Sequence, residues 1–260
     1  MNEGVPTDEE FIVRKIDDYF IYNITVPKTF TIVTIIEGIE VIPDRYFASC
    51  VYLRQVNLPQ SLRKIGKSAF SKCFHLEMVN LPRNVIDIGK CAFKWCKRLR
   101  EIDIPEGIER VPEECFSECL SLKQVNLPQS LREIGHSAFS NCDSLEMVNL
   151  PRNVISIGEL AFMWCKKLRE IDIPEGIERV RKECFSECMS LKQVNLPQSL
   201  REIWNSAFYN CVSLEMVNLP RNINYIEKRA FMLCKKLREI DIPPGVEYVA
   251  EECFKFCFKL

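Results

Sequence analysis

A 23-residue period begins at residue 30, continues to the end of the 260-residue chain, and limits the fold more than any other feature. Each unit has apolar residues at positions 1, 4, 6, 10 and 13, phenylalanine at position 18 and cysteine at position 21. A degenerate unit begins at Phe30, and since (260 − 30)/23 = 10, ten units fill residues 30–259. A coil this short cannot bury its own apolar face, so we expect successive units to stack. The regular units begin at Leu53, Leu76, Leu99, Leu122, Leu145, Leu168, Leu191, Leu214 and Leu237.

Within a unit, the pattern predicts one short strand followed by a tight turn. Leu122, Val125 and Leu127 are apolar around a polar position 5, which is typical of a strand with one buried and one solvated face. A proline such as Pro128 then ends the strand, because it cannot donate the next ladder hydrogen bond. We expect the segment from Ala138 to Cys142 to form a helical or 3-10 turn. The stacked strands would form a parallel sheet along one face of a curved rod.

The unit LKQVNLPQSLREIGHSAFSNC at 122–142 resembles the leucine-rich repeats of the BspA-like type, also called the Treponema pallidum type. The mark of that family is LxxIxLPxxLxxIGxxAFxxC. The resemblance covers residues 30–260 and implies an α/β solenoid. This would be a right-handed leucine-rich-repeat superhelix with a parallel β-sheet on its concave face and short helical or 3-10 turns on its convex face. The resemblance also implies adhesion or protein recognition, and it brings no catalytic residues.

The sequence predicts two domains: an N-terminal capping segment, 1–29, and ten leucine-rich repeats, 30–260. Residues 11–27 are apolar and aromatic enough for a hairpin or helix that covers the open end of the stack. The other end, CFKFCFKL at 253–260, lacks a polar cap. The sequence therefore predicts either truncation or end-to-end self-association there.

Composition excludes several classes of function. With 35 basic and 36 acidic side chains, the chain gives no electrostatic reason to expect nucleic acid. No apolar run is long enough to span a membrane. The N-terminus lacks the pattern of a secretory signal, so the chain as given is expected in the cytoplasm, or at the cell surface or secreted if a signal was removed. The only two histidines, His75 and His136, lie at drifting outward positions, so no Ser-His or Cys-His pairing recurs, and we expect no enzyme and no cofactor.

Ten of the fourteen cysteines recur at an interval of 23, from Cys50 to Cys257. One structural position repeated in this way favours buried, reduced thiols. The other four are Cys91, Cys115, Cys184 and Cys253. Zinc would need further nitrogen or sulfur ligands, and Ca²⁺ at Glu101, Asp103 and Glu106 is disfavoured by the neighbouring Arg100, so no metal site is expected.

A second period of three units identifies the candidate binding face. Residues 53–121 and 122–190 match at 55 of 69 positions, and 191–259 follows the same plan. Positions 3 and 5, on the solvated side of the strand, stay unchanged between triplets, whereas solvated positions on the opposite face drift, as from Lys64 to Glu133. The candidate partner-binding residues on the concave face are Gln55, Asn57, Met78, Asn80, Glu101, Asp103, Gln124, Asn126, Met147, Asn149, Glu170, Asp172, Gln193, Asn195, Met216, Asn218, Glu239 and Asp241.

Alternatives stay open at this stage. The Asn and Asp residues at position 5 could form only a structural ladder along the sheet. A basic, aromatic cluster around Trp95 and Trp164 could contact nucleic acid or membrane, although packing between coils is the favoured interpretation. The leading function is a non-catalytic scaffold that binds a protein, or else a glycan. The alternative is an adhesive or self-assembling surface protein that forms homo-oligomers through its uncapped end.

Overall fold

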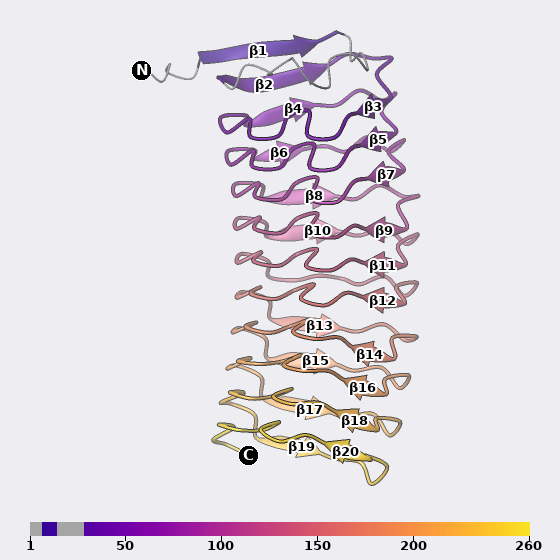
Figure 1. Cartoon of the computed structure of the whole chain (residues 1–260), viewed down its shortest axis with the longest axis vertical. Coiled ribbons are helices and arrows are strands. Elements are labelled where there is room, and N and C mark those ends of the chain that lie inside the picture. Colours follow the sequence, from indigo (N-terminus) through magenta and orange to yellow (C-terminus); the bar gives the residue numbers. More distant parts are fainter. Residues whose placement is uncertain (1–6, 15–28) are drawn as a thin grey trace.

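The computed structural model describes residues 7–14 and 29–260 and shows a single stack of coils (Figure 1). Positions 3–5 of most units form the longer strands of one face, and side chains alternate between core and solvent along them. In the unit from Leu145, Met147 makes single bridges to Gln124 and Glu170 in place of a strand. These strands are β1 (Thr7–Val13), β2 (Phe30–Ile35), β4 (Gln55–Asn57), β6 (Met78–Val79), β8 (Glu101–Asp103), β10 (Gln124–Asn126), β13 (Glu170–Asp172), β15 (Gln193–Asn195), β17 (Met216–Asn218) and β19 (Glu239–Asp241).

Positions 12 and 13 form a second ladder of shorter strands, which the sequence analysis did not predict. Both ladders are parallel, and each residue pairs with the same unit position of the adjacent coil, as Gln124 does with Glu101 and Glu133 with Arg110. The predicted stack with a parallel sheet is therefore confirmed. The second ladder consists of β3 (Val41–Ile42), β5 (Lys64–Ile65), β7 (Asp87–Ile88), β9 (Arg110–Val111), β11 (Glu133–Ile134), β12 (Ser156–Ile157), β14 (Arg179–Val180), β16 (Glu202–Ile203), β18 (Tyr225–Ile226) and β20 (Tyr248–Val249).

A column of phenylalanines at position 18 forms the centre of the core. Ten rings from Phe47 to Phe254 stack face to face, with centroids 5.2–5.6 Å apart and interplanar angles of 2–9°. Nine of them, Phe47 to Phe231, are fully buried. Because each ring contacts the equivalent ring of the next coil, the column fixes the register of the whole stack.

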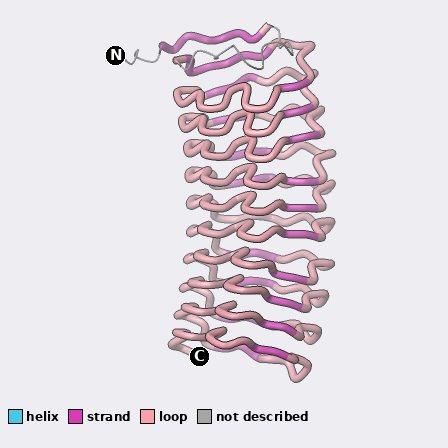
Figure 2. Tube along the Cα trace, in the orientation of Figure 1, coloured by secondary structure: helices cyan, strands magenta, loops and turns pink. Residues whose placement is uncertain are grey.

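The segment at positions 14–22 is not helical, and the prediction of helical or 3-10 turns was wrong. No helix occurs in the described residues, and Figure 2 shows this segment as loop. The backbone N–H groups of Ser68, Phe70 and Lys72 donate to carbonyls of the next coil, at 2.8 Å each. The intervening N–H groups donate three residues back within their own coil. Positions 16 and 20 have positive φ, as in Ser68 (55°) and Lys72 (63°), so alternate amides point along the stack instead of along a helix axis.

At the N-terminal end, β1 pairs in parallel with β2, and the Phe11 and Phe30 rings stack with centroids 4.9 Å apart. These two strands extend the sheet and are not a hairpin. Most of the predicted capping element, residues 15–28, lies outside the described residues.

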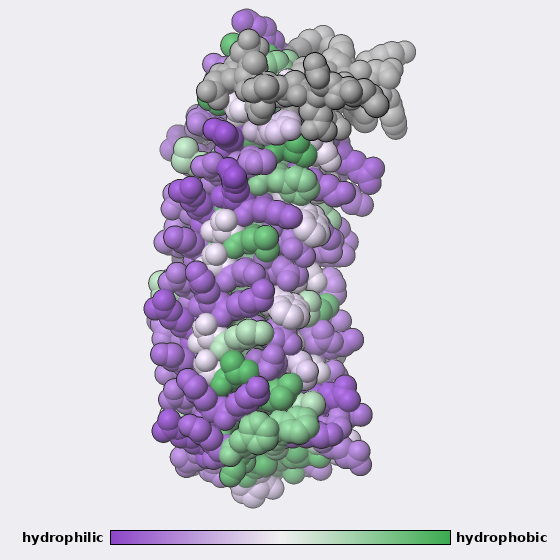
Figure 3. Space-filling model, turned by 90° about the vertical axis from the view of Figure 1, so that its left-hand side faces the viewer, coloured by the Kyte–Doolittle hydropathy of each residue, from purple (hydrophilic) through white to green (hydrophobic). Residues whose placement is uncertain are grey.

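The last coil leaves apolar side chains exposed. Phe258 is 72% exposed and Leu260 56% exposed, and no other described coil covers them. On the face drawn in Figure 3, apolar surface gathers at this end of the stack. Self-association through this end stays a prediction.

Candidate functional site

The predicted binding residues occupy one continuous surface, which we call the strand face and define as positions 2, 3 and 5 of the units. Of the eighteen predicted residues, seventeen are exposed and Gln55 is half-buried. Parallel pairing places position 3 of one unit beside position 3 of the next, as in Met216 beside Glu239. Position 5 follows the same rule, as in Asn218 beside Asp241. The structure therefore brings the predicted residues together in two rows along the stack.

One part of the position 5 row is a structural hydrogen-bond network. The Asn126 side-chain amide donates to the carboxylate of Asp103 in the preceding coil, and Gln124 donates to Asn126 at 2.9 Å. The same arrangement recurs one triplet later, at Gln193, Asn195 and Asp172. At the first triplet, Asn57 donates instead to the Thr34 hydroxyl at 2.8 Å. These asparagines link each triplet to the coil before it.

The other asparagines of this row have free side chains. Within the described residues, Asn80, Asn149 and Asn218 make no side-chain hydrogen bond, although all three are exposed. A continuous Asn ladder along the sheet is therefore absent from the part of the chain that the structure describes. Their amide groups stay available to a partner.

Two equivalent depressions lie on the strand face around Met78 and Met147. The first has a volume of about 590 Å³ and the second about 610 Å³. Both are lined by positions 2 and 3 of four successive coils. The two methionines are 43% and 49% exposed, which is unusual for so apolar a side chain. The first is lined by Arg54, Gln55, Glu77, Met78, Arg100, Glu101, Lys123 and Gln124, and the second by Lys123, Gln124, Glu146, Met147, Arg169, Glu170, Lys192 and Gln193.

The position 2 side chains of these depressions were not among the predicted site residues. A pattern that could have identified them was present in the sequence, because the charge at position 2 is basic, acidic and basic in the three units of every triplet. Arg100 lies 3.7 Å from Glu77, and Arg169 lies 3.3 Å from Glu146, so these charges are paired. Such exposed pairs contribute little stability.

The carboxylate at position 8 of the first, fourth and seventh units has a structural role. Glu106 accepts hydrogen bonds from the backbone N–H groups of Gln129 and Ser130 in the next coil, at 3.1 and 3.4 Å. Glu37 and Glu175 accept the equivalent bonds from the coils that follow them. Glu106 and Asp103 are therefore already engaged by protein donors. Among the described residues, no group of three or more His, Cys, Asp or Glu side chains could hold a metal ion.

The cysteines at position 21 form a column of thiol donors. Cys142 Sγ lies 3.2 Å from the Phe116 carbonyl oxygen of the preceding coil, and the equivalent contact spans 3.1–3.3 Å from Cys73 to Cys257. Burial raises the pKa of Cys142 and Cys165 well above its usual value. These groups are protonated thiols, which are weak nucleophiles.

On the turn segment, the aromatic residues engage the neighbouring cations. Lys97 Nζ lies 5.1 Å from the Trp95 ring centroid and 5.2 Å from that of Phe74, and Lys166 lies 5.3 Å from the Trp164 ring. Both tryptophans are half-buried. Each tryptophan is therefore in contact with one lysine of its own cluster.

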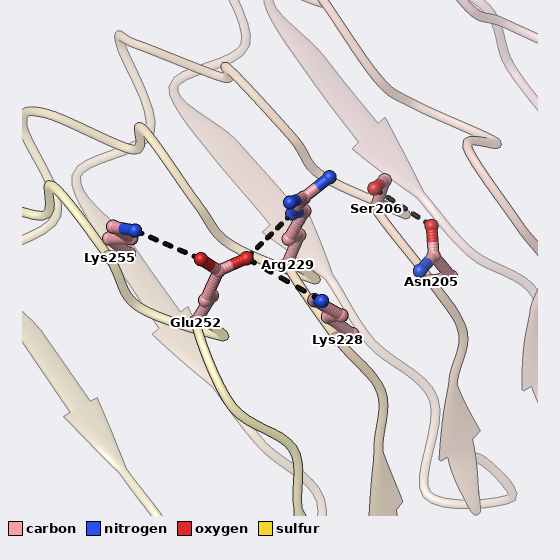
Figure 4. A network of polar contacts seen from close by, with 6 residues as sticks. All are labelled: Asn205, Ser206, Lys228, Arg229, Glu252 and Lys255. Atoms are coloured by element: carbon pink, nitrogen blue, oxygen red, sulfur yellow. Dashed lines mark hydrogen bonds and ion pairs between the residues drawn. The ribbon is translucent and has the colours of Figure 1, made fainter.

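A polar network surrounds Glu252 on the last coil (Figure 4). Glu252 accepts hydrogen bonds from Lys255 Nζ at 2.9 Å and from Arg229 Nε at 2.8 Å, and Lys228 Nζ lies 3.9 Å away. The bonds from Lys255 and Arg229 lower the pKa of Glu252 to about 2. The network joins the ninth and tenth coils.

Stacked short coils, a parallel sheet and a leucine, phenylalanine and cysteine core define a leucine-rich-repeat solenoid. The sequence profile of the BspA type leucine rich repeat region (6 copies) matches residues 14–146 and 132–260. The chain belongs to this family. The described residues contain no helix that is long and apolar enough to cross a membrane.

Several solved structures are similar to this chain. A leucine rich cell surface protein from Faecalibacterium prausnitzii is 26% identical, with a TM-score of 0.54 over 89% of this chain and 78% of that one. A leucine-rich repeat protein from Bacteroides ovatus is 24% identical, with a TM-score of 0.55 over 90% and 78%. The leucine rich repeat protein of Treponema pallidum is 26% identical, with a TM-score of 0.49 over 85% and 86%. No curated protein matches the chain significantly.

Proposed function

We propose that this protein is a non-catalytic scaffold that binds a protein partner through its strand face, with a glycan as the second class of partner. The observation that carries the proposal is the pair of equivalent depressions around Met78 and Met147. They keep exposed apolar groups and unpaired polar groups at the same unit positions in two successive triplets. Large exposed apolar side chains within a polar rim are typical of protein-binding sites.

The lack of a recurring acid–base pair in the described residues supports a binding function. His75 Nδ1 lies 2.6 Å from the Val51 carbonyl oxygen, and its ring stacks on Tyr52 with centroids 6.1 Å apart. His75 is at position 23 of the unit from Leu53, whereas His136 is at position 15 of the unit from Leu122, three coils further on, so the two imidazoles belong to separate surroundings. A scaffold needs neither of them as a general base.

Affinity capture tests the proposal. The bait is the chain itself, compared with a variant in which Glu101, Glu170 and Glu239 are replaced by lysine. All three carboxylates are exposed and form no ion pair within the described residues, so the variant is expected to fold. We expect the variant to lose the captured partner, because three charges on the strand face are reversed.

The chain offers a matched control on its other side. Glu109, Glu178 and Glu247 lie in the same three units, at position 11 before the short strands, and are equally exposed. Replacing them by lysine changes the net charge by the same amount. The proposal requires that this control retain the partner. Loss of the partner by the control alone, or equal retention by both variants, would refute it.

The likeness to a protein described as a cell surface protein also supports display at the cell surface. The cytoplasm remains the other expectation. Protease treatment of intact cells that produce the protein distinguishes the two. Digestion of the chain while a cytoplasmic marker stays intact supports the surface, and protection of the chain supports the cytoplasm.

A further inference from the structure

The short strands of the second ladder are not paired along the whole stack. With coils numbered from the unit that begins at Phe30, β7 of the third coil pairs with β5 and β9 of the fourth coil pairs with β11, but β7 and β9 do not pair with each other. The same break separates β12 of the sixth coil from β14 of the seventh. We call these two breaks the seams. Figure 1 shows that the short strands on either side of each seam lie farther apart than the other neighbouring short strands do.

The backbone hydrogen bonds of the second ladder stop at the seams. Between the second and third coils, the N–H group of Ile86 donates to the Arg63 carbonyl at 2.9 Å. The corresponding donors of the fourth coil are the N–H groups of Glu109 and Arg110, and within residues 29–260 they have no acceptor on the third coil. The same holds for positions 11 and 12 of the seventh coil in the described structure. Each seam therefore lacks the bonds that join the other coils on this side.

The ion pairs of the second ladder also stop at the seams. Asp87 pairs with Lys64 of the preceding coil at 2.8 Å, and Arg110 pairs with Glu133 of the following coil at 2.7 Å. Asp87 and Arg110 have the same unit position on the two sides of the first seam and opposite charges, yet no ion pair joins them in the described part of the chain. At the second seam, Arg179 likewise pairs with the following coil, at 3.1 Å. Polar contacts on this side thus divide the rod into blocks.

The junction between the ninth and tenth coils shows the closed arrangement at the equivalent place of the next triplet. The N–H group of Tyr248 donates to the Asn224 carbonyl at 3.2 Å, and the rings of Tyr225 and Tyr248 stack with centroids 4.9 Å apart. At both seams an isoleucine stands at the position of this asparagine. These are Ile86 and Ile155, and each is 60% exposed. The break is therefore specific to the two seams and does not belong to the repeat itself.

Each seam contains a small depression of its own, with a volume of about 250 Å³ at the first seam and about 390 Å³ at the second. Gly107 and Gly176 line these depressions and have φ of 95° and 94°, in the left-handed region that favours glycine. Gly245, at the same unit position of the tenth coil, has no positive φ. The unpaired strands therefore have space into which they can move.

The turn segment, by contrast, stays bonded across both seams. At the first seam, the N–H group of Phe93 donates to the Cys115 carbonyl at 2.9 Å, and the rings of Phe93 and Phe116 stack with centroids 5.5 Å apart. At the second seam, the N–H group of Phe162 donates to the Cys184 carbonyl, also at 2.9 Å. The coils on either side of a seam are thus held together on one side and open on the other.

On the strand face, each seam passes through one of the two candidate binding depressions. Met78 of the third coil and Glu101 of the fourth coil both line the first depression, and the second seam divides the second depression in the same way. The N–H group of Arg100 donates across the first seam to the Glu77 carbonyl at 3.4 Å, but β6 and β8 do not pair. Movement at a seam therefore changes the distance between the walls of the depression that spans it.

We infer that the rod bends at the two seams, with the turn segment as the pivot, and that this bending sets the width of the two strand-face depressions. The first three coils, the next three and the last four move as blocks. Bending is confined to the seams because it breaks no hydrogen bond of the second ladder there, whereas elsewhere it would. The effect on the depressions rests on the proposed function, since it concerns the regulation of that same face. A partner would select the seam geometry that fits it.

Distances between pairs of nitroxide labels test the bending in the intact chain. The labels are attached to p-acetylphenylalanine, because thiol labels would react with the native cysteines, and the distances are measured by double electron–electron resonance. The ladder pair is Arg63 with Arg201, beside the second ladder, and the turn pair is Lys90 with Lys228, on the turn segment; all four residues are exposed. Each pair spans six coils, about 28–29 Å, and crosses both seams. We expect the distance distribution of the ladder pair to be about twice as wide as that of the turn pair.

A third pair tests the effect on the depressions. Arg54 and Lys192 are exposed on the strand face, also span six coils and also cross both seams. Their distribution should have a width between those of the other two pairs, because the strand face keeps fewer bonds across a seam than the turn segment does. A width equal to that of the turn pair would show that the depressions keep a fixed shape, and would overturn that part of the inference.

A variant that closes the second seam supplies the matched comparison. Ile155→Asn, Ser156→Tyr and Arg179→Tyr give this seam the residue types of the closed junction between the ninth and tenth coils. The distribution of the ladder pair should become shorter and narrower in this variant, while that of the turn pair stays unchanged. The inference is overturned by equal widths of the ladder and turn pairs in the unaltered chain, or by a ladder pair that stays as broad in the variant. No partner is used in these measurements, so their failure leaves the proposed function intact, whereas failure of affinity capture would remove the role in binding and leave the bending.

Discussion

The side-chain amide of Asn126 donates a hydrogen bond to the carboxylate of Asp103, the residue at the same unit position in the preceding coil. The equivalent bond joins Asn195 to Asp172. Asn149, one coil after Asn126, has no such bond within the described residues. The repeat therefore uses the same residue type at the same position for two purposes, to connect triplets and to leave a free amide on the strand face.

This difference predicts unequal effects of two alanine substitutions. Asn126→Ala removes a donor to a charged acceptor and should lower the free energy of unfolding by about 1 kcal/mol. Asn149→Ala removes no side-chain bond and should change it by less than about 0.5 kcal/mol. Urea denaturation measures both. Equal effects of the two substitutions would show that the bond to Asp103 contributes nothing.

The phenylalanine column predicts that replacing one of its rings by alanine lowers the stability of the protein, by an amount that depends on the position of the ring in the stack. Phe139 is fully buried and stacks on Phe116 and Phe162, with centroids 5.5 and 5.4 Å away. Phe139→Ala should lower the free energy of unfolding by about 3–5 kcal/mol, because it leaves a cavity between two rings. Phe254 is half-buried and stacks only on Phe231 in the described chain, so Phe254→Ala should have a smaller effect. Denaturation followed by circular dichroism would contradict this if the two variants lost equal stability.

Thiol reactivity tests the cysteine column. Burial raises the pKa of ladder thiols such as Cys142, Cys165 and Cys211, so a disulfide reagent at pH 8 should leave these buried thiols unmodified in the native protein. Cys91 and Cys257 are half-buried and should react first. In guanidinium without reductant, all fourteen cysteines should react. A count well below fourteen would mean that disulfides exist and that the column is not a set of free thiols.

The network around Glu252 predicts that the stability of the protein depends on the Glu252 carboxylate only at acidic pH. Its pKa of about 2 in the folded protein lies below the usual value of 4.5, so the network stabilises the protein above about pH 4.5 and this effect is lost as the pH falls toward 2. A ¹³C NMR titration of the Glu252 carboxyl group should show a midpoint near 2. Lys255→Gln and Arg229→Gln should each raise the midpoint toward 4.5, since each removes a positively charged donor. A midpoint near 4.5 in the unmodified protein would contradict the network.

Much of the fold could be predicted because each column of core residues appears in the sequence as one residue type that recurs at a fixed interval. The spacing of Phe116, Phe139 and Phe162 already requires stacked coils, and the alternation around Val125 predicts the strand. The turn segment could not be predicted in the same way. Alternate amides there, such as that of Phe139, donate to the next coil instead of back along a helix. Hydrogen bonds between coils leave no periodic signal within one coil.

The placement of the candidate residues could be predicted in part, for a similar reason. Residues at position 3, such as Met78, are exposed on the strand face as expected, and their role in binding stays a prediction. Position 2 was left out of the site, although Lys123 lies in both depressions, because the exchange of Arg54 for Lys123 made the position look variable. Both residues are cations, so the exchange keeps the positive charge of the depression wall. The Asn126 bond to Asp103 depends on neighbours in adjacent coils and was visible only in the structure.

Photo-crosslinking through methionine tests whether the strand face is the binding surface, because the seven methionines include residues of the strand face and of the turn segment. Photo-methionine is incorporated throughout the chain, the captured partner is crosslinked, and the adducts are located by mass spectrometry. If the partner binds the strand face, we expect adducts on Met78 and Met147. Adducts confined to the methionines of the turn segment, Met163, Met189 and Met232, would contradict it.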